Sequence, residues 1–162
     1  MLPTAPIDDV VQRLERLFQG LAAAATVRHA ASRARMAALW ARAHPGQTPP
    51  WGELPLATLV LSVDAIIDHA RALGAAVDGR LIDDRLAALA PCLAELADEP
   101  LWVVTDDLTS HYCRAAELLA HARGDDLVLD GDLVCVAAFA PRVLILHHED
   151  WIFDLRPVDA SR

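Results

Sequence analysis

The stretch LVLDGDLVCVAAFAPRVLILHHEDWIFDL, residues 127–155, decides the fold because it is typical of consecutive β-strands. Residues 127–129 are predicted to pair with residues 133–139 across Asp130-Gly131, a dipeptide that readily forms the tight turn of a hairpin. Ala140-Pro141-Arg142 makes the next break in the pattern. The sequence therefore predicts a β-meander in the last quarter of the chain.

The middle of this stretch predicts a sheet that is covered on both faces. The runs LVCVAAF, residues 133–139, and VLIL, residues 143–146, contain no polar side chain. Strands of this kind are buried on both sides. Residues 151–155 differ, because they alternate. Trp151, Phe153 and Leu155 are expected on one face and Ile152 and Asp154 on the other, as in a half-exposed edge strand.

The first half of the chain is predicted to be helical. Apolar residues recur at helical spacing, and proline and glycine mark the breaks. A break at His44-Pro45-Gly46 separates an N-terminal helical hairpin or arm, residues 1–44, from a Pro/Gly-rich hinge, residues 45–55, and an α/β body, residues 56–162. The four predicted helices span residues 7–21, 21–43, 56–73 and 82–96.

A strand–helix–strand unit is predicted to connect the two halves. Residues 101–105, LWVVT, form a short apolar strand, and residues 109–123 are interpreted as a helix that leads to residue 127. Such a crossover places its two strands parallel in one sheet. The prediction is a single α+β domain, residues 1–162, with a mainly antiparallel sheet of four to five strands.

Charge is distributed unevenly along the chain, whose net charge is −9. Residues 1–52 carry six arginines and three acidic residues, whereas residues 98–162 carry five arginines and thirteen acidic residues. The second half is thus an acidic body, which repels nucleic acid and attracts basic partners. We therefore expect a basic protein partner and consider nucleic acid an unlikely one.

Composition also bears on the cellular setting. The chain has no lysine and no asparagine, which indicates a high-GC bacterial genome. Cys92, Cys113 and Cys135 are odd in number and unclustered, as expected for reduced thiols. Because the N-terminal segment is acidic and no long apolar run follows it, we predict a cytoplasmic protein without a membrane segment.

One side of the predicted helix at residues 21–43 favours self-association. Small residues at helical spacing allow a second helix to approach closely. Arg28, Arg35 and Arg42 form a separate stripe on the other side. The residues predicted to form a homodimer interface are Ala30, Ala34, Ala37 and Ala41.

The first candidate for chemistry is Asp106-Asp107 with His111, where a strand is predicted to end and a helix to begin. Carboxylates at such a position could hold a divalent cation or act as an acid and a base. The alternative interpretation is structural: Asp107 caps the helix and Asp106 completes the turn. We favour the structural interpretation.

The second candidate is His147-His148-Glu149-Asp150. Adjacent side chains of a strand point to opposite faces, so His147 and His148 are not expected to bind one metal ion together. A dyad of Cys113 with a distant histidine is a third, weaker candidate. Phosphate-loop, zinc-protease and nucleophile-elbow motifs are absent from the sequence, and we predict no cofactor and no metal.

Three functions remain open. The favoured one is a non-enzymatic, acidic protein-binding module, such as an immunity or inhibitor protein that neutralises a basic partner. The alternatives are a small enzyme that uses Asp106, Asp107 and His111, with His147 from the neighbouring strand, and a dimeric scaffold or regulator. The predicted partner-binding residues are Asp125, Asp126, Asp130, Asp132, Glu149 and Asp150.

Overall fold

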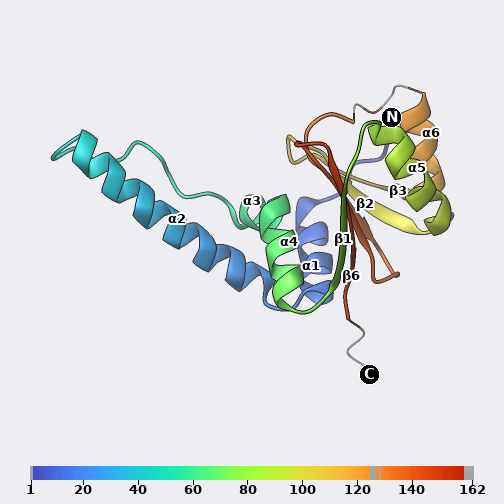
Figure 1. The fold of residues 1–162 in the computed structure, drawn as a ribbon, viewed down its shortest axis with the longest axis horizontal. Coiled ribbons are helices and arrows are strands. Elements are labelled where there is room, and N and C mark those ends of the chain that lie inside the picture. Colours follow the sequence, from blue (N-terminus) through green and yellow to red (C-terminus); the bar gives the residue numbers. More distant parts are fainter. Residues whose placement is uncertain (1, 125–126, 128, 159–162) are drawn as a thin grey trace.

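The protein is an α+β structure in which helices cover both faces of one antiparallel sheet (Figure 1). The computed structural model describes residues 2–124, 127 and 129–158. The described helices are α1 (Ile7–Leu17), α2 (Leu21–Ala43), α3 (Leu56–Val60), α4 (Val63–Ala72), α5 (Arg85–Leu96) and α6 (Ala115–Arg123). The described strands are β1 (Ala76–Leu81), β2 (Pro100–Val104), β3 (Ser110–Arg114), β4 (Leu133–Ala137), β5 (Val143–His147) and β6 (Trp151–Arg156).

The sheet has the strand order β1-β6-β5-β4-β2-β3, and every neighbouring pair is antiparallel. The predicted fold class is therefore confirmed, with six strands in the described residues instead of four or five. All residues of β4 and β5 are buried. They coincide with the two runs without polar residues, apart from His147 at the end of β5, and they lie at the centre of the sheet.

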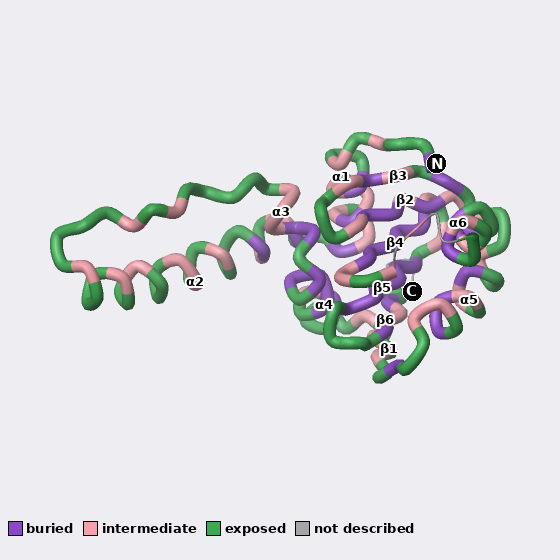
Figure 2. The backbone as a smooth tube through the Cα atoms, turned by 90° about the horizontal axis from the view of Figure 1, so that it is seen from above, coloured by how far each residue is buried: buried purple, intermediate pink, exposed green. Residues whose placement is uncertain are grey.

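Each central strand contributes to two separate cores. In β5, Val143 and Ile145 pack in the core beneath α1, α3 and α4, whereas Leu144 and Leu146 pack in the core beneath α5 and α6. The residues of β4 alternate in the same way. Figure 2 shows buried chain along the central strands, with helices on either side. The molecule is thus a three-layer structure with the sheet in the middle.

The predicted hairpin across Asp130-Gly131 is wrong. Leu127 and Leu129 are outside the strands, Val128 lies outside the described residues, and β4 pairs with β2 and β5. Both edges of β4 are occupied by these partners, so a segment at residues 127–129 cannot pair with it. The chain bends at Gly131, which has a φ of 73°, but this bend does not join two paired strands.

The predicted strand–helix–strand crossover is present, but its first strand is β3 and not residues 101–105: α6 connects β3 to β4, and these two strands are parallel to each other on either side of β2. The chain reverses after β2 and forms the antiparallel strand β3 at Ser110–Arg114, and a helix begins only at Ala115. Cys113 therefore lies in a strand. The reversal includes Leu108 at a φ of 62°. Two hydrogen bonds close it: Thr105 N–H donates to Thr109 O at 3.0 Å, and Leu108 N–H donates to Thr105 O at 2.9 Å.

The N-terminal segment lies along the free side of β3. Thr4 forms a β-bridge with His111, Ala5 N donates to Ser110 O at 2.9 Å, and Tyr112 N donates to Pro3 O at 3.0 Å. Helix α1 begins directly after this segment, with Pro6 as its N-cap. This contact gives the edge strand a partner on its second side.

Strand β1 was not predicted, because Asp78-Gly79 is typical of a turn. Gly79 instead faces the ring of Phe153 on β6, and a Cβ at this position would lie 2.5 Å from Phe153 Cε1. The glycine makes room for an aromatic ring on the neighbouring strand. The predicted helix at residues 56–73 is likewise divided into α3 and α4 by a break at Leu61-Ser62.

Helix α2 projects from the body, and the segment that follows it returns alongside it to α3 (Figures 1 and 2). Only Leu21 and Ala25 of α2 are buried. In contrast, α1 is part of the core through Val10 and Leu14. The projection is therefore made of α2 and residues 44–55, and α1 belongs to the body.

No described helix combines the length and the apolar character that a bilayer-spanning segment requires.

Two adjacent residues of β5 test the two-sided burial. Leu144 is 1% exposed and Ile145 is fully buried, in different cores. We predict that Leu144→Ala and Ile145→Ala each lower the free energy of unfolding by about 2–5 kcal/mol, because each leaves a cavity. Urea unfolding followed by circular dichroism measures both. Leu81→Ala, at a residue that is 66% exposed, is the control and should change stability by less than about 0.5 kcal/mol. A neutral effect of either core variant would contradict the three-layer arrangement.

Candidate functional site

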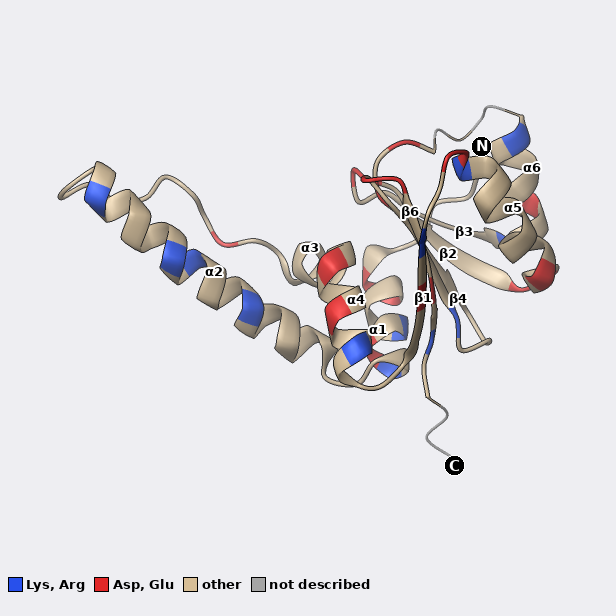
Figure 3. Ribbon diagram, in the orientation of Figure 1, with Lys and Arg blue, Asp and Glu red and all other residues tan. Residues whose placement is uncertain are grey.

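The strand register brings several acidic loops to one end of the sheet. The ends of β2, β5 and β1 lie beside the starts of β4 and β6, since Val104 pairs with Val134, Leu133 with Leu146, and Leu81 with Trp151. The loops at these strand ends form what we call the acidic end, seen as red loop segments in Figure 3. Its residues are Asp83, Asp84, Asp106, Asp107, Asp130, Asp132, Glu149 and Asp150.

Four of the six predicted partner-binding residues lie at the acidic end: Asp130, Asp132, Glu149 and Asp150. The other two, Asp125 and Asp126, lie outside the described residues. Asp83 and Asp84 were missed, because they belong to the start of α5, where Asp84 accepts a hydrogen bond from Ala87 N as an N-cap. The sequence of a helix cap does not indicate which loops lie beside it in the folded protein.

Arg85 holds two of the acidic loops together. Its Nη1 donates to His147 O at 3.0 Å and lies 3.6 Å from Asp150 Oδ1, and its Nη2 donates to Gly131 O. The side chain is only 16% exposed. This guanidinium therefore fixes the β5–β6 turn against the loop that precedes β4.

Asp132, His147 and His148 form a compact group at the centre of the acidic end. One potential ligand atom from each residue lies within 4.8 Å of those from the other two. Asp132 Oδ1 accepts hydrogen bonds from His148 N at 2.8 Å and contacts His148 Nδ1 at 2.9 Å. The two imidazole rings are stacked, with centroids 4.1 Å apart.

The prediction that His147 and His148 point to opposite faces is therefore wrong. The strand β5 ends at His147, and His148 begins a turn in which Asp150 has a φ of 61°. The alternation of a strand applies only within the strand. One residue past its end, the second histidine turns back beside the first.

Asp106 lies next to this group. It lines a hollow of about 130 Å³ together with Asp64, Asp132 and His148, and its Oδ1 accepts from Asp132 N at 3.4 Å. A Cβ at Gly131 would lie 2.6 Å from Asp106 Oδ2, so glycine is needed there for the carboxylate to approach. Asp64, in the first turn of α4, also lies 3.4 Å from His147 Nε2.

Asp107 and His111 are placed elsewhere. Asp107 Oδ1 accepts from Thr105 Oγ1 at 2.5 Å and from Thr109 N at 3.2 Å, and these bonds lower the pKa of the carboxyl group. The predicted helix cap is therefore wrong, because Asp107 stabilises a β-turn. His111 pairs with Val103, whose side chain packs beneath α5 and α6.

The structure thus does not assemble Asp106, Asp107 and His111 into one site. Asp132 and His148 form a compact group with His147, and the same two residues line the hollow beside Asp106.

The cysteine candidates are held in their thiol form. Burial raises the pKa of Cys113 to about 11, and burial also raises the pKa of Cys92 and of Cys135. A nucleophilic cysteine requires a lowered pKa. These thiols therefore behave as core residues.

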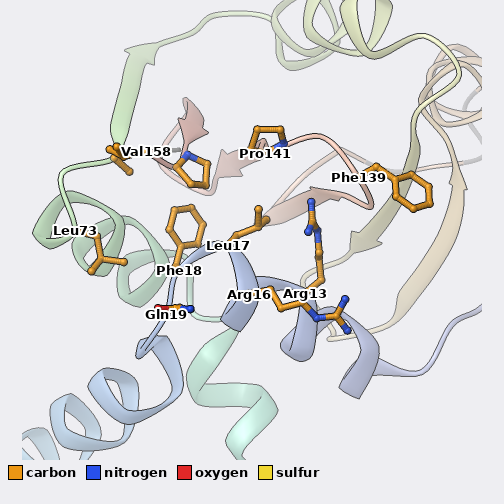
Figure 4. A pocket seen from close by; sticks show the side chains of 11 residues that line it. Arg13, Arg16, Leu17, Phe18, Gln19, Leu73, Phe139, Pro141 and Val158 are labelled. Carbon is orange, nitrogen blue, oxygen red and sulfur yellow. The ribbon is translucent and has the colours of Figure 1, made fainter. Parts of the chain in front are cut away.

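A larger hollow of about 560 Å³ lies at the opposite end of the sheet (Figure 4). Its walls include Phe18, Phe139 and Pro141, and its charged residues are Arg13 and Arg16. Arg13 already donates to Ala137 O at 2.9 Å and to Ala140 O at 3.0 Å. This arginine therefore ties α1 to the β4–β5 loop, which explains its presence without a ligand.

Comparisons with models of protein families, with curated proteins and with solved structures returned no match.

The contact with Asp132 predicts how His148 titrates. The hydrogen bond to Asp132, and then its negative charge, raise the pKa of His148 above its ordinary value of 6.5. A pKa raised by folding contributes stability that is complete below about pH 6.5 and is lost as the pH rises through the raised pKa. We predict that Asp132→Asn lowers the pKa of His148, as measured by NMR titration of the imidazole. Asp107→Asn is the matched control and should leave this pKa unchanged. An equal pKa in wild type and Asp132→Asn would contradict the contact.

Proposed function

We propose that the protein binds a basic partner protein through the acidic end, as an immunity or inhibitor protein does. The observation that supports this proposal is the convergence of carboxylates from separate loops onto one surface. Asp83, Asp106, Asp130, Glu149 and Asp150 are all exposed there. Like charges gathered on one surface repel one another, and a surface of opposite charge relieves this repulsion.

The placement of the basic residues also supports the proposal. Three of the basic residues, Arg13, Arg142 and Arg156, belong to the other end of the sheet, where β5 starts and β6 finishes, whereas Arg85 lies within the acidic end with a side chain that is only 16% exposed. Arg142 is 10% exposed at its side chain and pairs with Asp154 at 2.8 Å and with Glu95 at 2.8 Å. The acidic end therefore contributes an uneven field that orients a basic partner as it approaches and accelerates association.

The rigidity of the surface is a third argument. Arg85 joins the two central loops, and Asp84 caps α5. A surface whose loops are already held in place loses less conformational entropy when a partner binds. Exposed charges on such loops act on the association rate and on its dependence on salt more than on packing.

Neutralising three exposed carboxylates tests the proposal. We predict that the triple variant Asp83→Asn, Asp130→Asn, Glu149→Gln weakens partner binding by about 0.6–3 kcal/mol, since an exposed ion pair contributes about 0.2–1 kcal/mol. The full chain is immobilised, a lysate of the source organism is applied at 50 mM salt, and retained basic proteins are identified by mass spectrometry and titrated. At this low ionic strength exposed charges are only weakly screened.

The matched control carries the same change of net charge at other exposed positions, Glu53→Gln, Asp78→Asn and Asp98→Asn. Retention by wild type and the control, with loss in the triple variant and at high salt, supports the proposal. If no basic protein is retained at low salt, or if both triple variants bind equally, the acidic end is not the partner surface.

A second candidate function is self-association through α2, as in a dimeric scaffold. The projection of α2 away from the body supports it, together with the exposure of Val27 (70%), Met36 (47%) and Leu39 (65%). Ala30, Ala34 and Ala41 are exposed and Ala37 is half-buried. A helix that leaves so much apolar surface uncovered is typical of an interaction surface.

Solution mass tests this second candidate. We predict that the wild-type chain has twice the mass of one chain in light scattering at micromolar concentration, and that Ala34→Glu with Ala41→Glu returns it to one chain, because two carboxylates would be buried in the contact. Ala43→Glu is the control, since two positions along a helix place it on the far side from Ala41. A wild-type monomer would remove this candidate.

A further inference from the structure

We propose that Asp132, His147 and His148 form a binding site for a divalent transition-metal ion of the zinc class. This inference goes beyond the proposed partner binding, because it concerns a ligand that the chain would bind alone. Two imidazole nitrogens and one carboxylate oxygen are a donor set that Zn²⁺ and its neighbours in the first transition row prefer. Sites with three protein ligands keep a position open for water or for a further ligand.

The distances within the group fit a shared ion after small adjustments. The three candidate ligand atoms lie within 4.8 Å of one another. Ligands at about 2.0–2.2 Å from zinc in tetrahedral geometry lie about 3.3–3.6 Å apart. Asp132 Oδ1 and His148 Nδ1 are at 2.9 Å, so this pair opens slightly to admit an ion, and the third ligand moves inward.

The surrounding contacts hold two of the three ligands in place. The backbone of His148 donates to Asp132 Oδ1 at 2.8 Å, and the carbonyl of His147 is held by Arg85. His147 is 8% exposed, which limits its side chain to few conformations. Ligands that are positioned before the metal arrives lose little entropy when it binds.

Two further carboxylates give the site an outer shell. Asp64 Oδ1 lies 3.4 Å from His147 Nε2, and a carboxylate beside a ligating histidine orients the ring and makes it a better donor. Asp106 lines the adjacent hollow with Asp132 and His148. The negative charge of Asp106 adds to the attraction for a cation, and the hollow has room for water at the open position.

One existing hydrogen bond is lost when the metal binds. His147 Nδ1 accepts from Glu149 N at 3.1 Å. If Nδ1 takes the metal, its lone pair is no longer available to the amide. If Nε2 takes the metal instead, Nδ1 carries the proton and cannot accept, and Asp64 gives up its contact with Nε2, so that it supports the ring only in the Nδ1-bound form. The Glu149 amide therefore reports on metal binding through either nitrogen.

Titration with ZnCl₂ alone tests the site on the full wild-type chain. We expect saturable binding of one Zn²⁺ per chain in isothermal titration calorimetry and a shift of the Glu149 amide signal in the ¹⁵N spectrum. His148→Gln and Asp132→Asn should each weaken binding by at least about tenfold. Replacing an outer-shell partner typically costs about tenfold or more in metal affinity, and these two residues are direct ligands. His148 is exposed at 52% of its side chain, so its replacement tests the site without removing core packing.

Two matched controls make the result specific. Asp107→Asn removes a carboxylate of the same acidic end that is engaged in its own turn, and His44→Gln removes a histidine stacked on Trp40 of the projecting helix. Both should bind Zn²⁺ like wild type. Absence of one-to-one binding, or binding by the His148→Gln and Asp132→Asn variants that is as tight as that of wild type, would overturn the site. Because no partner protein is present, this outcome is independent of the test of partner binding.

Discussion

Burial of β4 and β5 on both faces is the constraint on which the rest of the structure depends. Every residue of these strands is buried, and their side chains alternate between two cores. Neither face of the sheet centre can be left to solvent, so helices must lie on both sides of it. Polar chemistry is thereby excluded from the faces and confined to the ends of the strands, where the acidic end and the arginine-lined hollow are found.

The elements that were predicted correctly are those whose own composition decides their state. The central strands are apolar apart from His147 at the end of β5, and α2 and α5 show helical periodicity, so local sequence and tertiary environment agree. The two edge strands were missed because their sequences favour something else. In β1, Asp78-Gly79 is typical of a turn, yet Gly79 accommodates the ring of Phe153. In β3, pairing with β2 and with the N-terminal segment outweighs the helical pattern that begins after it.

The candidate site was predictable only in part, for a related reason. The acidic loop residues Asp130, Asp132, Glu149 and Asp150 follow from turn composition, but their convergence depends on strand order, which the missed strands altered. Whether His147 and His148 lie together depends on the one residue at which β5 ends. Asp64 and Arg85 reach the same loops from helices more distant in the sequence, and their local sequence contains no indication of it.

The hydrogen bonds between residues 3–5 and β3 have a practical consequence. Strand β3 is at the border of the sheet, and this short segment occupies the main-chain groups on its outer side. A strand with such groups uncovered is a template for pairing with another molecule. A purification tag or a truncation that removes residues 3–5 from β3 would therefore leave an unpaired strand edge. Aggregation of such a preparation would be caused by the altered N-terminus and not by the native surface.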